Sequence, residues 1–148
     1  MTPCEELEQV LFDEGYKIVS RSITAPFQAL AIKQNKHIIL NMERIKSHAD
    51  RYCTLMHEKG HFECDLFYTL NSRQDLMRES ERIVDIWTVK HLCPLDLLAY
   101  LLFVRKMEPH EIAAELEVNE NIVKKAFNLY NDLETWNRVK MTMLREFE

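Results

Sequence analysis

Glycine and proline are scarce in this chain of 148 residues, which has only two glycines and four prolines. A sandwich or barrel of many short strands needs a turn residue about every ten positions, so this scarcity argues against such folds. Apolar residues make up 47% of the sequence and charged residues 29%, a balance that predicts a packed core rather than disorder. We therefore expect a single globular domain built from few elements.

Long hydrophobic runs are also lacking. The longest, Leu97–Val104, is far shorter than the roughly 20 residues that span a bilayer. The chain opens on Met1-Thr2-Pro3-Cys4, without the basic and apolar regions of a secretory signal. Its four cysteines form no CxxC pair, which favours small buried thiols over a disulfide framework. We expect a soluble cytoplasmic protein with no membrane partner.

An excess of basic charge is missing as well, since 19 basic and 24 acidic residues give a net charge of −5. Proteins that bind nucleic acids through phosphate contacts carry the opposite bias. The pattern of Glu111–Lys125 resembles a helix-turn-helix, but the chain from Met107 onward is also acidic. We interpret this stretch as two packed helices and expect no direct nucleic-acid binding, which disfavours a DNA-binding regulator.

Hydrophobic periodicity predicts an α+β fold, with a small antiparallel sheet near the N-terminus followed by a mostly helical core. A first helix is expected over Cys4–Asp13, ended by Gly15. Three short apolar segments then predict two or three antiparallel strands, with a hairpin between the last two: Lys17–Ile23, Ala29–Lys33 and His37–Asn41.

From about Ser47 the pattern is helical almost to the end. The predicted helices cover Ser47–Phe62, Ser72–Cys93, Leu95–Lys106, Glu111–Glu117 and a long final stretch from Asn119 towards Phe147. We read residues 1–148 as one domain, with the sheet and core in about 1–106 and a C-terminal helical segment in about 107–148.

One motif of the sequence is typical of a metal-binding, catalytic site. His57-Glu58-Lys59-Gly60-His61 is an HExxH sequence inside a predicted helix. Residues four apart lie one turn above each other, so the imidazoles of His57 and His61 can bind one ion. Zinc suits two neutral imidazoles and a carboxylate, and it lowers the pKa of a bound water to about 7. Glu58 lies beside that face, where it can take a proton from the metal-bound water as the water attacks a carbonyl.

A structural zinc site made of Cys53, His57, His61 and Cys64 is the rival interpretation of this helix. Helical geometry rejects it, because Cys53 and Cys64 are separated by about 16 Å of helix. Zinc ligands lie only about 2.0–2.3 Å from the ion. The two cysteines are therefore expected to be packing residues.

The third ligand must come from another element. The next predicted helix offers Glu79, Glu81 and Asp85 after a loop long enough for an antiparallel return. Helical spacing favours Glu81 or Asp85 over Glu79 without choosing between them.

At this point the sequence resembles the ImmA/IrrE metallo-endopeptidases of bacteria, phages and integrative elements. That family's HExGH motif matches His57–His61, including Gly60. Its second signature, E-x-x-A-D-x-W-A followed by L-I-P, is similar to Glu81–Thr88 and Leu92–Pro94 at the glutamate, aspartate, tryptophan, leucine and proline. The resemblance implies that His57, His61 and Glu81 bind zinc and that Glu58 is the catalytic base.

The resemblance also implies a function: a zinc-dependent endopeptidase that cleaves a partner regulatory protein, such as a helix-turn-helix repressor of a phage or other mobile element. The alternative is a non-catalytic zinc-containing module that docks a regulator. Glu58 favours the enzyme, because a structural zinc site needs no carboxylate beside its histidines. Tyr68 and His110 are candidates to donate a hydrogen bond to the oxyanion of the reaction, and the sequence assigns this role to neither.

Overall fold

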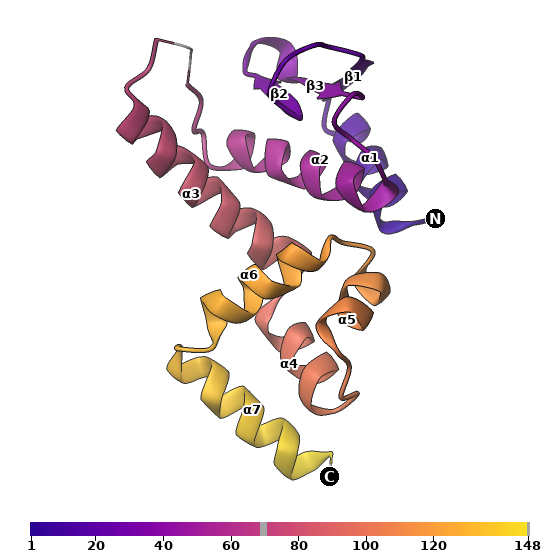
Figure 1. The fold of residues 1–148 in the computed structure, drawn as a ribbon, viewed down its shortest axis with the longest axis vertical. Helices are drawn as coiled ribbons and strands as arrows, with labels where there is room; N and C mark the ends of the chain where they lie inside the picture. Colours follow the sequence, from indigo (N-terminus) through magenta and orange to yellow (C-terminus); the bar gives the residue numbers. More distant parts are fainter. Residues whose placement is uncertain (69–70, 148) are drawn as a thin grey trace. The chain divides into compact units, whose positions relative to one another are not determined.

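The computed structural model describes residues 1–68 and 71–147 (Figure 1). Within these residues the fold is α+β, as predicted, with helices and one small sheet near the N-terminus. The chain divides into two compact units, Met1–Thr88 and the residues from Val89 onward. The dividing point lies inside a helix, α3, which spans Gln74–Leu92.

The first unit begins with helix α1, Pro3–Asp13. Thr2 caps the helix by accepting a hydrogen bond from the backbone N–H of Glu5, and the Glu5 carboxylate accepts one from Thr2 in return. Gly15 follows the helix with φ of 89°, a backbone conformation that strains other residues. The predicted end of this helix is therefore confirmed.

The sheet contains β1 (Lys17–Arg21), β2 (Ala29–Ile32) and β3 (His37–Asn41) in the order β1-β3-β2. The antiparallel pairing of β2 with β3 is confirmed, and a short 3₁₀ turn at Gln34–Lys36 joins the two strands. β1, however, pairs with β3 in parallel, so the expectation of a fully antiparallel sheet is wrong there. A wide connection reverses the chain between β1 and β2, which leaves the apolar β3 in the centre.

The hydrophobic core of this unit lies between the sheet and two helices, α1 and α2 (His48–Glu63), as Figure 1 shows. Buried aliphatic side chains from all three elements meet in this core: Leu7, Leu11, Ile38, Leu40 and Leu55. An ion pair also joins the two helices, with 2.8 Å between Arg51 Nε and Glu8 Oε1. Helix α2 begins close to the predicted start at Ser47, which caps it by accepting a hydrogen bond from the N–H of Asp50. These contacts position α2, the helix that carries the HExxH motif.

The second unit contains the end of α3 and four further helices: α4 (Leu95–Phe103), α5 (Pro109–Leu116), α6 (Glu120–Tyr130) and α7 (Glu134–Glu146). α5 and α6 pack together. Glu117, in the left-handed conformation with φ of 56°, ends α5.

The expectation of one long final helix is wrong, because the chain turns between α6 and α7. Asn131 and Asp132, which favour turns, lie at this break. The turn allows Trp136 to be buried, with its ring centroid 6.2 Å from that of Tyr130 and 5.5 Å from that of Phe103. Burial of a tryptophan outweighs the loss of a few helical hydrogen bonds.

Among residues 1–68 and 71–147, no single helix is long and apolar enough to cross a membrane. Taken together, α3 and α4 have that length and composition, but they form a bent pair. All four cysteines are free thiols, and Cys4, Cys53 and Cys93 are buried.

Asn41, at the end of β3, is fully buried and organises two loops of the first unit. Its Oδ1 accepts hydrogen bonds from the N–H of Ile23 at 3.1 Å and of Glu43 at 3.2 Å. Its Nδ2 donates to the carbonyl of Phe27 at 2.9 Å and to that of Ala25 at 3.4 Å. One side chain thus fixes the backbone on both sides of the sheet end.

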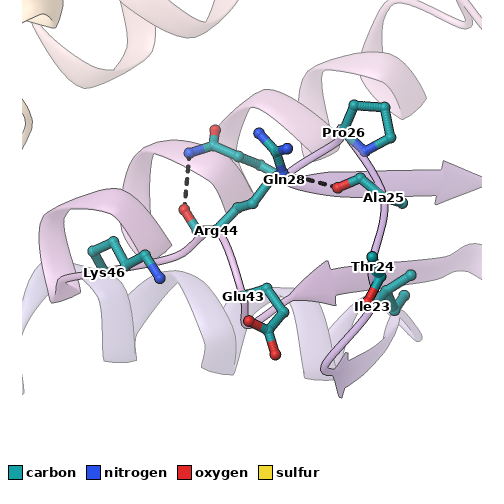
Figure 2. Close-up of a pocket in the computed structure, with 8 residues that line it drawn as sticks. All are labelled: Ile23, Thr24, Ala25, Pro26, Gln28, Glu43, Arg44 and Lys46. Atoms are coloured by element: carbon teal, nitrogen blue, oxygen red, sulfur yellow. Dashed lines mark hydrogen bonds between the residues drawn. The ribbon is translucent and has the colours of Figure 1, made fainter.

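These loops line the hollow drawn in Figure 2. Arg44 Nε donates to the Ala25 carbonyl at 2.8 Å, and Gln28 Nε2 donates to the Arg44 carbonyl at 3.3 Å. The lining residues include none of the motif: they are Ile23, Thr24, Ala25, Pro26, Gln28, Glu43, Arg44 and Lys46.

We predict that Asn41→Ala destabilises the first unit, because it removes the partners of two backbone N–H and two carbonyl groups. The expected loss is about 1–3 kcal/mol in the free energy of unfolding, measured by urea denaturation. Gln34→Ala, which removes an exposed amide side chain of the same unit, serves as the control and should change stability by no more than about 0.5 kcal/mol. Equal stability of the two variants would contradict this role for Asn41.

Candidate metal centre

Two histidines of α2 face the same point one helical turn apart. The rings of His57 and His61 have centroids 5.2 Å apart and are nearly perpendicular. His57 Nε2 lies 2.9 Å from Oε2 of Glu81, and His61 Nε2 lies 3.1 Å from Oε1 of the same carboxylate. Glu81 lies on α3, so two helices of the first unit supply the three side chains.

Among the residues that the structure describes, these three form the group that can hold a metal ion, with all ligand atoms within 4.8 Å of one another. Two atoms that each lie about 2 Å from one zinc ion are at most about 4 Å apart, so the group needs only a small adjustment. Of the alternatives that the sequence left open, the structure brings Glu81 to both histidines. Asp85 is not part of the group, and Glu79 pairs with Arg82 at 2.7 Å.

The two helices can approach closely because residue 60 is a glycine. A Cβ atom at Gly60 would lie 2.9 Å from Cε3 of Trp87 and 3.0 Å from Cγ1 of Val84. Val84 is fully buried and has little room to move. A larger residue at this position would force Trp87 and Val84 to shift, and with them the part of α3 next to the histidines.

His61 is held in one orientation by the chain that follows α2. Its Nδ1 lies 2.7 Å from the carbonyl oxygen of Leu66. A carbonyl only accepts, so Nδ1 carries the proton and Nε2 faces Glu81. Burial lowers the pKa of His61, but its hydrogen bonds to the Glu81 carboxylate and the Leu66 carbonyl raise it more.

The Glu81 carboxylate is strongly stabilised in its charged form. Burial would raise its pKa, yet hydrogen bonds from His57, His61 and Tyr68 hold the pKa well below its usual range. The hydroxyl of Tyr68 donates to Oε1 at 2.5 Å. An ionised carboxylate facing two imidazoles is a suitable donor set for a divalent cation.

Glu58 is buried beside this group, with 7% of its surface exposed. Burial raises the pKa of its carboxyl, and the nearby charges of His57 and His61 offset only part of this rise. Glu58 does not belong to the metal-holding group. Its position agrees with the expectation of a carboxylate next to, but not on, the ion.

The structure also shows where the other residues considered from sequence lie relative to this group. Neither Cys53 nor Cys64 belongs to the metal-holding group. Tyr68, considered from sequence as an oxyanion donor, has its hydroxyl on Glu81. His110 lies on α5, in the second unit. Sequence analysis missed the role of Leu66, because a backbone carbonyl leaves no signal in side-chain patterns.

The chain matches no protein-family model, curated protein or solved structure with which it was compared. The function proposed below therefore depends on the site and on the sequence resemblance.

We predict that the purified protein binds close to one metal ion per chain and that His57→Ala, His61→Ala and Glu81→Ala each remove most of it. Elemental analysis of the purified variants measures this. Glu79→Ala, which removes an exposed carboxylate from the same helix, is the matched control and should retain the metal. Full retention by Glu81→Ala together with loss by Asp85→Ala would show that the third ligand is wrongly assigned.

We predict that Gly60→Ala weakens metal binding as well as stability, because the new methyl group collides with Trp87 and Val84 on α3. Overpacking of this kind costs about 1–3 kcal/mol. Gly15→Ala is the matched control: its Cβ meets nothing within 4 Å, but its φ of 89° imposes strain.

Both glycine variants should therefore unfold more easily, while only Gly60→Ala should lose metal affinity. Chemical denaturation in the presence of a chelator and metal titration of the folded protein separate the two effects. Undiminished metal affinity in Gly60→Ala would show that the close helix approach does not position the ligands.

Proposed function

We propose that this protein is a zinc-dependent endopeptidase that cleaves a partner regulatory protein. The observation that supports this proposal is the convergence of His57, His61 and Glu81 beside the buried carboxyl group of Glu58. Catalytic zinc sites in peptidases use two histidines and a glutamate and leave one position open for water or substrate.

The donor set fits zinc in two respects. Two imidazoles and one carboxylate match the ligand types of hydrolytic zinc sites. Histidine ligands of zinc usually donate their other ring N–H to an oxygen, and His61 does so to the Leu66 carbonyl. The group thus has an oriented ligand as well as the appropriate atoms.

In the proposed reaction each residue has a separate task. His57, His61 and Glu81 would hold the zinc ion, which would polarise the peptide carbonyl and lower the pKa of a bound water. Glu58 takes a proton from the attacking water and later delivers it to the leaving amine. Burial raises the pKa of Glu58, which strengthens this carboxylate as a base.

The substrate class is inferred from the resemblance to the ImmA/IrrE family. Such a peptidase cuts a regulator of a mobile element or stress response, and we propose a helix-turn-helix repressor as the substrate. The net charge of −5 supports a protein substrate over direct nucleic-acid binding. A non-catalytic module that docks the same regulator would need the fold but not Glu58.

We predict that Glu58→Gln abolishes cleavage and leaves zinc binding intact. Glutamine keeps the shape of the side chain but cannot accept a proton, and general acid–base catalysis contributes about 10²–10⁴-fold. The measurement is co-expression with a candidate helix-turn-helix repressor, followed by gel analysis of fragments and zinc analysis of the same preparations. Glu63→Gln, an exposed carboxylate on the same helix, should cleave like the wild type.

Two results would contradict the proposal. Undiminished cleavage by Glu58→Gln would remove this residue from the mechanism. A stable complex with the repressor but no cleavage by any variant, the wild type included, would favour the docking module.

A further inference from the structure

We propose that Leu66–Tyr68, the segment that directly follows α2, positions two of the three metal ligands and thereby sets the metal affinity of the site. Tyr68 is the side chain through which it acts on Glu81. The inference rests on the metal centre of the proposed function and adds residues that neither the HExxH motif nor the Glu81 signature contains.

The first contact of the segment is with His61, through two hydrogen bonds. The backbone N–H of Leu66 donates to the His61 carbonyl at 3.0 Å, and the Leu66 carbonyl accepts from Nδ1 of the His61 ring at 2.7 Å. Asp65, with φ of 51°, turns the chain so that both bonds form. The ring of His61 therefore cannot rotate without breaking a bond to the segment.

The second contact is with Glu81. The hydroxyl of Tyr68 donates to Oε1 at 2.5 Å, and the same oxygen lies 3.1 Å from Nε2 of His61. Hydrogen bonds to a carboxylate are short and strong because the acceptor is charged. Tyr68 thus restrains the rotation of the carboxylate and holds its oxygen towards the histidine.

The segment is itself anchored to the rest of the first unit. The ring of Phe67 packs edge-on against Phe62 of α2, with centroids 5.1 Å apart, and Lys33 lies 5.8 Å from the Phe67 centroid. Lys33 directly follows β2, and its ammonium lies 3.4 Å from the Asp65 carboxylate. The sheet and α2 therefore both hold the segment in place.

Such indirect contacts have a known magnitude. Groups that hydrogen-bond to metal ligands orient them, and their loss typically lowers metal affinity 10–100-fold. Tyr68 is 39% exposed, so removal of its hydroxyl leaves the core intact. We expect an effect on metal binding that is out of proportion to any effect on folding.

The test is Tyr68→Phe, which removes only the hydroxyl. Its affinity for Zn²⁺, measured by competition with a chromophoric chelator, should fall about 10–100-fold. Its thermal unfolding in the presence of EDTA should stay close to that of the wild type.

Tyr130→Phe is the matched control, because its hydroxyl donates to the buried Cys93 carbonyl at 2.8 Å in the second unit. It should unfold at a lower temperature with unchanged Zn²⁺ affinity.

A second pair of variants tests the turn. Asp65→Asn and Asp65→Val both remove the charge that faces Lys33, but only asparagine tolerates the left-handed conformation of residue 65. Asp65→Asn should bind Zn²⁺ like the wild type, and Asp65→Val about 10-fold more weakly.

The results separate this inference from the proposed function. Wild-type Zn²⁺ affinity in Tyr68→Phe, with a wild-type protein that binds Zn²⁺ tightly, overturns the positioning role of Tyr68 alone. Equal affinities of the two Asp65 variants overturn the role of the turn. Failure of the wild type to bind Zn²⁺ overturns the metal centre itself and this inference with it.

Discussion

The candidate metal centre of the first unit depends on one ionised carboxylate placed between two imidazoles. Burial alone would raise the pKa of Glu81, but hydrogen bonds from His57, His61 and Tyr68 lower it and keep the carboxylate charged. The pKa of His61 is raised by its interaction with the same carboxylate, because a proton on that ring compensates the negative charge of Glu81. A divalent cation between these side chains would supply that compensation instead. A metal ion and protons should therefore compete for these ligands. The cluster is thus stable as a hydrogen-bonded group and already arranged as a ligand set.

The position of the carboxylate is a consequence of helix packing rather than of the motif. α2 presents its histidines at a spacing fixed by the helix, but Glu81 reaches them because α3 lies close to α2 at Gly60. Gly60 is the residue that permits this approach, since its missing Cβ leaves room for Val84 and Trp87. Gly60 therefore has a structural role: it makes room for α3, the helix that carries the third ligand. The sheet and α1 contribute by fixing α2 from its other side.

Sequence reasoning succeeded where structure is local. Most of the helices, the hairpin formed by β2 and β3, and the two histidines one turn apart follow from periodicity over a few residues. It was wrong where distant segments decide. The parallel pairing of β1 with β3 depends on which strand takes the centre of the sheet, and the break after α6 depends on the burial of Trp136. Periodicity left the choice between Glu81 and Asp85 open for the same physical reason, because both lie on a similar face of α3 and its packing on α2 brings Glu81 to the histidines.

The segment after α2 shows a further limit of such reasoning. Leu66 acts through its backbone carbonyl, so its side chain carries no trace of the contact with His61. Tyr68 is not part of a periodic element, and its hydroxyl meets Glu81 only because Asp65 adopts a left-handed conformation. The ligands, Glu58 and this segment all lie within Met1–Thr88, so one unit contains every residue to which a role is assigned above. The charge balance at Glu81 then couples them: the donors that orient the carboxylate also keep it ionised, and both properties are needed to bind a cation.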